Sequence, residues 1–364
     1  MKRGQRWPER QQGRSQRPTI KDVARVAHVS PATVSNVLLG RSSVAAALAE
    51  RVHKAVGALG YRTDVAASNL RRRQTAVIGL LVPDFANPFF AALTARVELL
   101  ARRAGYRLIV ASTAESAADE EEELRTLIGW RAAGLIVVPT DPAFAARRLL
   151  AAEGIPTIIV DRIPESLALD RIGVDNAVAS RAAVARLLDL GHRRILVAAS
   201  DVAVPNIRER IAGARAAVTG QAGAKIEVIV GGKELGQAAA VLEARLTRPA
   251  APTAVFALTS IGALATLRAA RRRALPVPEA LSLVSFDDTD WMEVLEPSVS
   301  AVHQPVEAVA EAAFTRLLAR LAGEQLESCE IRLACRIEWR RSTAAPVPRE
   351  PDRMTARGRN VHVS

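Results

Sequence analysis

The spacing of apolar residues divides the chain near residue 74. Before that point, three short stretches repeat their apolar residues every three or four positions, which is the period of an amphipathic helix. After it, short apolar runs alternate with helical stretches, from AVIGLLVP at 76–83 to LSLVSF at 281–286. This rhythm predicts parallel sheets covered by helices on both faces. We expect two sheets, because eight or more crossovers over about 265 residues exceed one ordinary sheet.

The first three predicted helices form a small module. Thr19 opens the first helix with Asp22 three residues later, which is a capping-box spacing. Ser30 is a good N-cap for the second helix, followed by Pro31 at its first position. Gly60 ends the third helix. The second helix turns small side chains outward: Ala32, Thr33, Ser35 and Asn36. This pattern fits a helix-turn-helix that enters a DNA major groove, although any small helical hairpin would share it.

Charge is concentrated on the same module. Residues 1–73 hold 15 Lys and Arg against 4 Asp and Glu, whereas residues 74–343 hold 31 against 32, in a chain of net charge +12. A basic module on a neutral body indicates that only the module meets a polyanion. A solubilising charged end would have the same composition, so charge alone leaves both open.

Other classes of protein are not favoured. No run reaches the roughly 20 apolar residues of a membrane span, and the basic N-terminus has no apolar stretch behind it like that of a signal peptide. We therefore expect a cytoplasmic protein without membrane contact. Cys329 and Cys335 form no disulfide framework or metal spacing, and we expect both as apolar residues in one strand. Without a GxSxG motif, a phosphate-binding loop or a His/Cys cluster, we expect no enzyme activity, cofactor or metal. We interpret His192 as a structural residue at a helix end.

Many ordered motifs from Thr19 to Ser342 resemble the lactose/galactose-repressor (LacI/GalR) family of bacterial regulators. They are TIKDVARVAHVSPATVSNVL, LGYR, GLLVPDFANPFF, GLIVVP, VDR, VDN, LGHRRI, RERIAG, PTAVF, and SLVSFDD followed by HQP. The resemblance implies an all-α helix-turn-helix headpiece, a hinge helix, and an α/β two-lobed sensor like periplasmic binding proteins, with two doubly wound parallel sheets. It also implies a homodimeric repressor on a palindromic operator of double-stranded DNA, controlled by a carbohydrate-like small molecule.

The expected domains follow from these patterns. They are a disordered basic arm at 1–17, the helix-turn-helix domain at 18–63, the hinge helix and linker at 64–74, the two-lobed domain at 75–342, and a disordered tail at 343–364.

Within the headpiece, the resemblance places Pro31, Ala32 and Asn36 at base-reading positions. Asn pairs with adenine where the Arg of many members pairs with guanine, so we expect a different operator preference. The hydroxyl residues are suited to phosphate contacts: Thr19, Ser30, Thr33 and Ser35. Leu70 aligns with the hinge leucine that members insert into the minor groove, although it could also be an ordinary helix anchor.

Two departures from the family pattern concern the headpiece framework. Residues 44–49 replace the usual Val-Ser-x-x-Thr-Arg with VAAALA, which removes an N-cap hydroxyl from the third helix. His28 replaces the usual Gly or Asn of the turn, so it carries strain if the turn is kept.

In the sensor, the resemblance assigns ligand binding to Arg210 and Asp287, with Asp161 as a second acceptor. An Arg fork and two carboxylates suit a polyhydroxylated ligand, although each residue could instead form a salt bridge between lobes or loops. Three further residues complete the candidate site: Phe85 and Phe89 as apolar walls, and Thr259 where members have Asn. Lys233 stands near a lost aromatic position and would suit an acidic ligand group, or it could simply be solvated.

Two further functions share this sensor. A solute-binding transport protein would need export and no headpiece, and the basic N-terminus has no signal-peptide pattern. A DNA-binding regulator without an effector remains compatible with the altered pocket positions.

Overall fold

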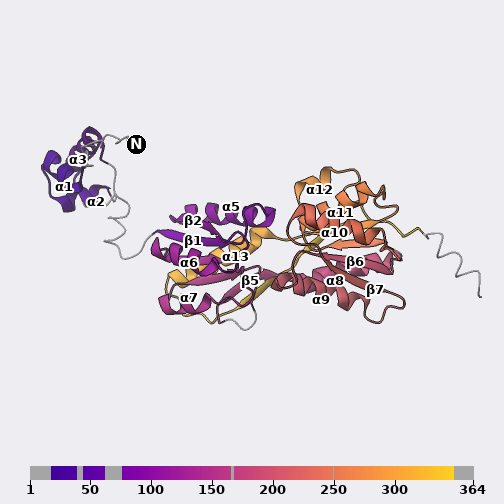
Figure 1. Ribbon diagram of the computed structural model, residues 1–364. Coiled ribbons are helices and arrows are strands. Elements are labelled where there is room, and N and C mark those ends of the chain that lie inside the picture. The colour runs from indigo at the N-terminus through magenta and orange to yellow at the C-terminus, as the bar shows by residue number, and fades with distance from the viewer. Residues whose placement is uncertain (1–17, 39–43, 62–75, 165–167, 249, 348–364) are drawn as a thin grey trace, which may run out of the picture. The chain divides into compact units, whose positions relative to one another are not determined.

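The computed structural model describes residues 18–38, 44–61, 76–164, 168–248 and 250–347 (Figure 1). The chain divides into two compact units between Thr75 and Ala76. The proposed arm at 1–17 and the proposed hinge with Leu70 lie outside the described residues.

The first unit contains three short helices, as the apolar spacing predicted. They are α1 (Ile20–Ala27), α2 (Pro31–Leu38) and α3 (Ala46–Leu59). Their shared core consists mostly of small apolar residues, which lets the helices approach closely: Val23, Ala24, Ala27, Val34, Val37, Val52 and Ala55.

The helix ends of this unit follow the local sequence. The Asp22 carboxylate accepts the backbone N–H of Thr19 at 2.9 Å and its hydroxyl at 2.7 Å, so it reaches back as the capping-box spacing predicted. His28 ends α1 in the left-handed region, with φ 50° and ψ 50°, and the predicted strain is therefore present. Arg51 of α3 donates to the carbonyls of Ala27 and His28 at 2.6 and 3.0 Å, and it caps the end of α1. Helix α3 has no side-chain cap, as expected.

The second unit contains two lobes, each built on a six-stranded sheet. The first sheet has the order β11-β5-β4-β3-β1-β2, and all of its pairs are parallel. Its strands are β1 (Val77–Val82), β2 (Arg107–Ser112), β3 (Gly134–Val137), β4 (Thr157–Val160), β5 (Asp170–Val174) and β11 (Glu330–Leu333). Helices α5 (Pro88–Arg103) and α13 (Val306–Leu321) pack on one face, and α6 (Glu120–Gly129) and α7 (Arg147–Glu153) on the other. We call this the first lobe.

The second lobe repeats the arrangement. Its sheet has the order β12-β10-β9-β8-β6-β7. The strands are β6 (Arg194–Ala199), β7 (Lys225–Val230), β8 (Ala254–Ala257), β9 (Ser282–Phe286), β10 (Ser300–His303) and β12 (Arg336–Glu338). Helices α8 (Asn176–Asp189) and α9 (Pro205–Val218) cover one face; α10 (Leu235–Leu246), α11 (Ser260–Arg272) and α12 (Asp290–Val294) cover the other. Two doubly wound sheets are thus confirmed, although the edge strand β12 runs antiparallel to β10.

The chain crosses between the lobes at three places: from β5 to α8, from β10 to α13, and from β11 to β12. All three crossings involve the two strands at one edge of each sheet. We call this edge the lobe hinge, which is separate from the hinge helix predicted at residues 64–74. Cys335 lies on the third crossing and Cys329 precedes β11. The prediction of both cysteines in one strand was wrong, because the chain leaves one sheet for the other between them.

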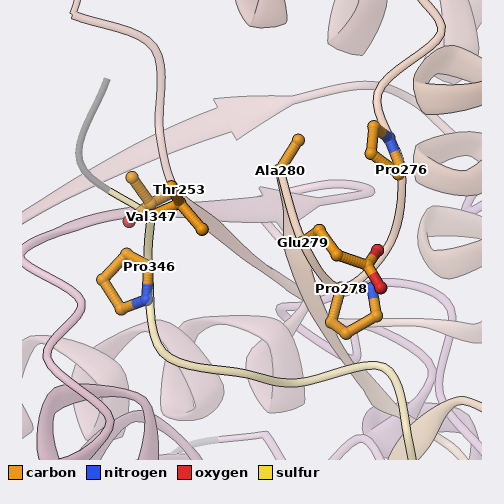
Figure 2. Close-up of a pocket in the computed structure, with 7 residues that line it drawn as sticks. All are labelled: Thr253, Pro276, Pro278, Glu279, Ala280, Pro346 and Val347. Atoms are coloured by element: carbon orange, nitrogen blue, oxygen red, sulfur yellow. The ribbon is translucent and has the colours of Figure 1, made fainter. Parts of the chain in front are cut away.

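The C-terminal segment differs from the tail expected to begin at residue 343. Ala344 donates its N–H to the Ser282 hydroxyl at 3.0 Å, and its carbonyl lies 2.9 Å from Nε2 of His192. Pro346 and Val347 then form one side of a cavity of about 290 Å³, opposite Pro276, Pro278, Glu279 and Ala280 (Figure 2). These contacts extend the ordered second lobe to residue 347. His192 is buried at the centre of this network, which confirms its structural role.

Among the described residues, no helix combines the length and apolarity needed to cross a membrane.

Candidate DNA and ligand sites

Helix α2 carries five of the residues predicted to meet DNA. Pro31 and Ala32 are exposed, and Thr33, Ser35 and Asn36 are half-buried. The Ser30 hydroxyl accepts the N–H of Thr33 at 3.0 Å and lies 2.9 Å from its hydroxyl. Ser30 is therefore the N-cap that the sequence predicted, and these two hydroxyls orient each other.

Arg210 is the central residue of the sensor. It lies on α9 and is 2% exposed. Its Nε donates to Oδ1 of Asn176 at 2.8 Å, and its Nη1 donates to the carbonyl of Leu258 at 2.7 Å. The guanidinium stacks on Phe286, with Cζ 3.6 Å from the ring centroid. These contacts fix the guanidinium plane, and among the described residues no hydrogen bond engages its Nη2.

Two carboxylates lie near this guanidinium, each at the carboxyl end of a strand. Asp161 follows β4 of the first lobe, and Asp287 follows β9 of the second lobe. Both have left-handed backbone, with φ values of 64° and 77°, which is uncommon for residues other than glycine. Ligands of such sheets bind beyond the carboxyl ends of the strands, so both residues stand in the expected region.

A carboxamide holds each carboxylate. Asn206 on α9 donates to Oδ2 of Asp161 at 2.9 Å, across the two lobes, and Gln304 donates to Oδ1 of Asp287 at 2.5 Å. The amide oxygens of Asn206 and Gln304 are buried and have no partner among the described residues. Burial raises the pKa of Asp161, while the charges of Arg210 and Arg162 oppose the rise. The site therefore offers several hydrogen-bond acceptors around one arginine.

A cavity of about 970 Å³ adjoins Asp287 and lies between elements of both lobes. Phe89 and Ala92 of α5 line it from the first lobe, and Ser260 and Gln304 are further lining residues. Phe89 and Asp287 line this cavity, whereas Arg210, Asp161 and the 57% exposed Phe85 are not among its lining residues. The role of Phe89 as an apolar wall for a ligand stays a prediction. Thr259 uses its hydroxyl to cap α11, accepting the N–H of Gly262 at 3.1 Å.

Lys233, expected near the pocket, forms an ion pair across the lobes. Its Nζ lies 2.8 Å from Oε2 of Glu115, and Arg162 also binds that carboxylate through both terminal nitrogens, at 2.5 and 2.9 Å. The sequence analysis left open whether Lys233 meets an acidic ligand group or solvent, and in the structure its partner is a carboxylate of the chain itself.

The sequence analysis missed five polar residues of this site. Arg162, Asn176 and Gln304 belong to the quoted motifs VDR, VDN and HQP, so a signal for them was present. Glu115 and Asn206 stand in no such motif.

Comparison with known proteins decides the family. Residues 19–64 match bacterial regulatory proteins of the lacI family, and residues 184–343 match a periplasmic binding protein-like domain. The transcriptional regulator PtxS of Pseudomonas plecoglossicida is 34% identical over 330 residues, covering 90% of this chain and 96% of the relative. The chain belongs to the lacI family of bacterial regulatory proteins.

Solved structures of lacI-family regulators agree with this fold. The lac repressor dimer bound to operator and the anti-inducer ONPF is 25% identical, with a TM-score of 0.81, over 90% of this chain and 99% of that chain. The complex of the regulator CelR with cellobiose is 28% identical, with a TM-score of 0.68, over 90% and 100%. This lacI-family protein is a DNA-binding transcription regulator, and its relatives are regulators rather than enzymes.

Proposed function

We propose that this lacI-family protein represses transcription as a homodimer on a palindromic operator, and that a small polyhydroxylated metabolite bound between the sensor lobes sets its operator affinity. The main support is Arg210, a buried guanidinium whose plane is fixed between Asn176, Leu258 and Phe286 beside two carboxylates. A buried arginine of this kind offers a directed donor to a ligand oxygen.

The chemistry around Arg210 favours a ligand rich in hydroxyl groups. Asp161 and Asp287 are acceptors, and the unpartnered amide oxygens of Asn206 and Gln304 add two more. Hydroxyl groups donate to such acceptors and accept from the arginine, so a sugar or sugar acid satisfies both kinds of group. Sugar-type ligands named for relatives, such as cellobiose with CelR, support the same class.

For the headpiece, we propose that α2 reads the major groove through Pro31, Ala32 and Asn36 and that Leu70 inserts into the minor groove. Thr19, Ser30, Thr33 and Ser35 would then position the helix on phosphates. Because a DNA-binding regulator acts where its DNA is, we propose that the protein works in the cytoplasm.

The homodimer requires an apolar surface on the sensor. Leu264 on α11 and Val294 and Leu295 at the end of α12 are 39%, 82% and 38% exposed, and both helices pack on one apolar cluster. Large apolar side chains that are exposed on a sensor surface are candidates for a protein interface. The dimeric lac repressor relative supports this assembly.

The test uses the full-length protein. An operator is selected from a random DNA library, and operator affinity is measured by fluorescence anisotropy with a panel of aldoses and aldonates. The melting temperature of the protein is measured with the same panel. We expect at least one compound to raise this melting temperature and to change operator affinity. If none does either, the metabolite part of the proposal is wrong and a regulator without an effector remains. If the selection yields no specific sequence, the operator part is wrong.

A further inference from the structure

One carboxylate at the lobe interface is held by two cations. Glu115 follows β2 of the first lobe, and both its oxygens accept from Arg162, which follows β4 of the same lobe. Lys233 reaches it from the second lobe, where it follows β7. A guanidinium fork on both oxygens with an ammonium on one of them is the geometry with which proteins bind carboxylate ligands.

The position of this group is set by sheet topology. β2 and β7 are the outer strands of their sheets, at the edges opposite the strands that form the crossings between the lobes. Glu115 and Lys233 therefore meet on the side of the lobe interface away from the lobe hinge. Arg162 is the next residue after Asp161, and its charge acts on that carboxylate. An anion at Arg162 would lie next to the group that we assign to ligand hydroxyls.

Glu115 reaches the two cations from a strained turn. Ala114 and Glu115 have φ values of 48° and 62°, so two successive residues with side chains adopt the left-handed region. Such backbone costs energy and persists only where the surroundings compensate for it. The turn is held by the Glu115 N–H, which donates to the carbonyl of Pro83 at 2.7 Å, and by the Ala114 N–H, which donates to the Ser112 hydroxyl at 3.2 Å. The pairing of the Glu115 carboxylate with Arg162 and Lys233 adds to these contacts.

Electrostatics favours the ionised form of Glu115. Burial raises the pKa of Glu115, but the hydrogen bonds and charges of Arg162 and Lys233 lower it by more. The pKa therefore lies below its ordinary value, and the carboxyl is ionised. Arg162 is 6% exposed and requires an anion. The Glu115 side chain is 20% exposed, and the nearby residues 117–119 are exposed. The side chain can therefore turn into solvent if another anion takes its place.

We propose that Arg162 and Lys233 form a carboxylate subsite of the sensor, that Glu115 occupies it in the absence of an effector, and that the effector is a polyhydroxylated acid whose carboxylate replaces Glu115. This inference rests on the proposed function, since Arg210, Asp161 and Asp287 hold the hydroxyl-bearing part of the same molecule. The class of effector is an aldonate-like sugar acid.

The subsite can be tested without knowing the effector. Glu115→Ala empties it, so sodium acetate should raise the melting temperature of this full-length variant more than sodium chloride of equal ionic strength, and more than it raises that of the wild type. Acetamide, which is neutral, should have no such effect. In the double variant Glu115→Ala/Lys233→Gln the acetate effect should shrink. An acetate effect equal to that of chloride would overturn the proposal.

Effector class is tested with the isosteric Glu115→Gln, which keeps the side-chain shape and also serves if the alanine variant does not fold. Calorimetry compares matched pairs of gluconate with glucose, galactonate with galactose, and ribonate with ribose. Loss of the competing charge should strengthen aldonate binding by about tenfold and leave aldose binding within about twofold. Aldoses that bind and change operator affinity, with no gain for any aldonate, would refute the acid subsite and leave the proposed function standing. No binding of either class to either protein would refute both the acid subsite and the metabolite part of the proposed function.

Discussion

Replacing Glu120 by glutamine should stabilise the protein at alkaline pH. Glu120 opens α6 and is 1% exposed. One of its oxygens accepts the N–H groups of Thr140 and Asp141, while Oε1 has no partner among the described residues. Burial raises the pKa of this carboxyl to about 7, although the two backbone hydrogen bonds act in the opposite direction. The folded state therefore binds the proton more tightly than the unfolded chain.

The size and sign of the effect follow from linkage. A folded pKa of about 7 against the ordinary 4.5 corresponds to about 3 kcal/mol, at roughly 1.4 kcal/mol per pKa unit. Below pH 4.5 both states hold the proton, so the burial of charge costs nothing. Between pH 4.5 and 7 only the unfolded state releases it, and stability falls as pH rises. Above pH 7 the full penalty applies. Glutamine does not ionise, so the variant avoids this penalty.

The assay is urea unfolding followed by circular dichroism at pH 5, 6, 7 and 8. Glu120→Gln should gain up to about 3 kcal/mol over the wild type at pH 8 and much less at pH 5. Glu121→Gln is the matched control, because Glu121 lies on the same helix and pairs only with the nearby Arg125 among the described residues. This control should change stability by a similar small amount at every pH. Parallel pH profiles for the wild type and Glu120→Gln would refute the reasoning.

Three further substitutions test individual features of the fold and of DNA reading. His28→Gly should stabilise the headpiece by about 1 kcal/mol in thermal unfolding, because glycine adopts the left-handed turn without strain, and an unchanged or lower stability would contradict this. Gly213→Ala should destabilise the sensor by about 2 kcal/mol or more in urea, because a Cβ there would lie 2.1 Å from the carbonyl oxygen of Ala177; wild-type stability would argue against this close packing of α8 and α9. Asn36→Arg should move one operator position from adenine toward guanine in selection from random DNA, and an identical selected sequence would remove Asn36 from base reading.

The sequence predicted the features that depend on neighbours in the chain. The capping of α1 by Asp22 and of α2 by Ser30 needs only residues three positions apart, and both are present. The alternation of strand and helix likewise predicted both sheets. The position of Cys335 was missed, because the crossing depends on β11 pairing with β5 and β12 pairing with β10, and local spacing does not show either pairing.

The candidate ligand site was predicted only in part for the same reason. Arg210, Asp161 and Asp287 belong to motifs that share a pattern with the family, so the sequence could name them. The pair of Glu115 and Lys233 joins residues 118 positions apart, and local spacing gives no sign of it. Thr259 was predicted as a pocket residue. In the structure its hydroxyl caps α11, which begins directly after it. Its contact with a ligand stays a prediction.

The central claim is that a ligand held by Arg210 controls DNA binding by a separate headpiece. Its most direct test is operator affinity by fluorescence anisotropy, for the wild type and Arg210→Ala, with and without the effector found in the ligand panel. Arg210→Lys serves as a second variant that fills the same space. The account predicts that the effector changes wild-type affinity by about tenfold or more, that both variants do not respond, and that all three proteins bind equally without effector. A full response in the variants would contradict it.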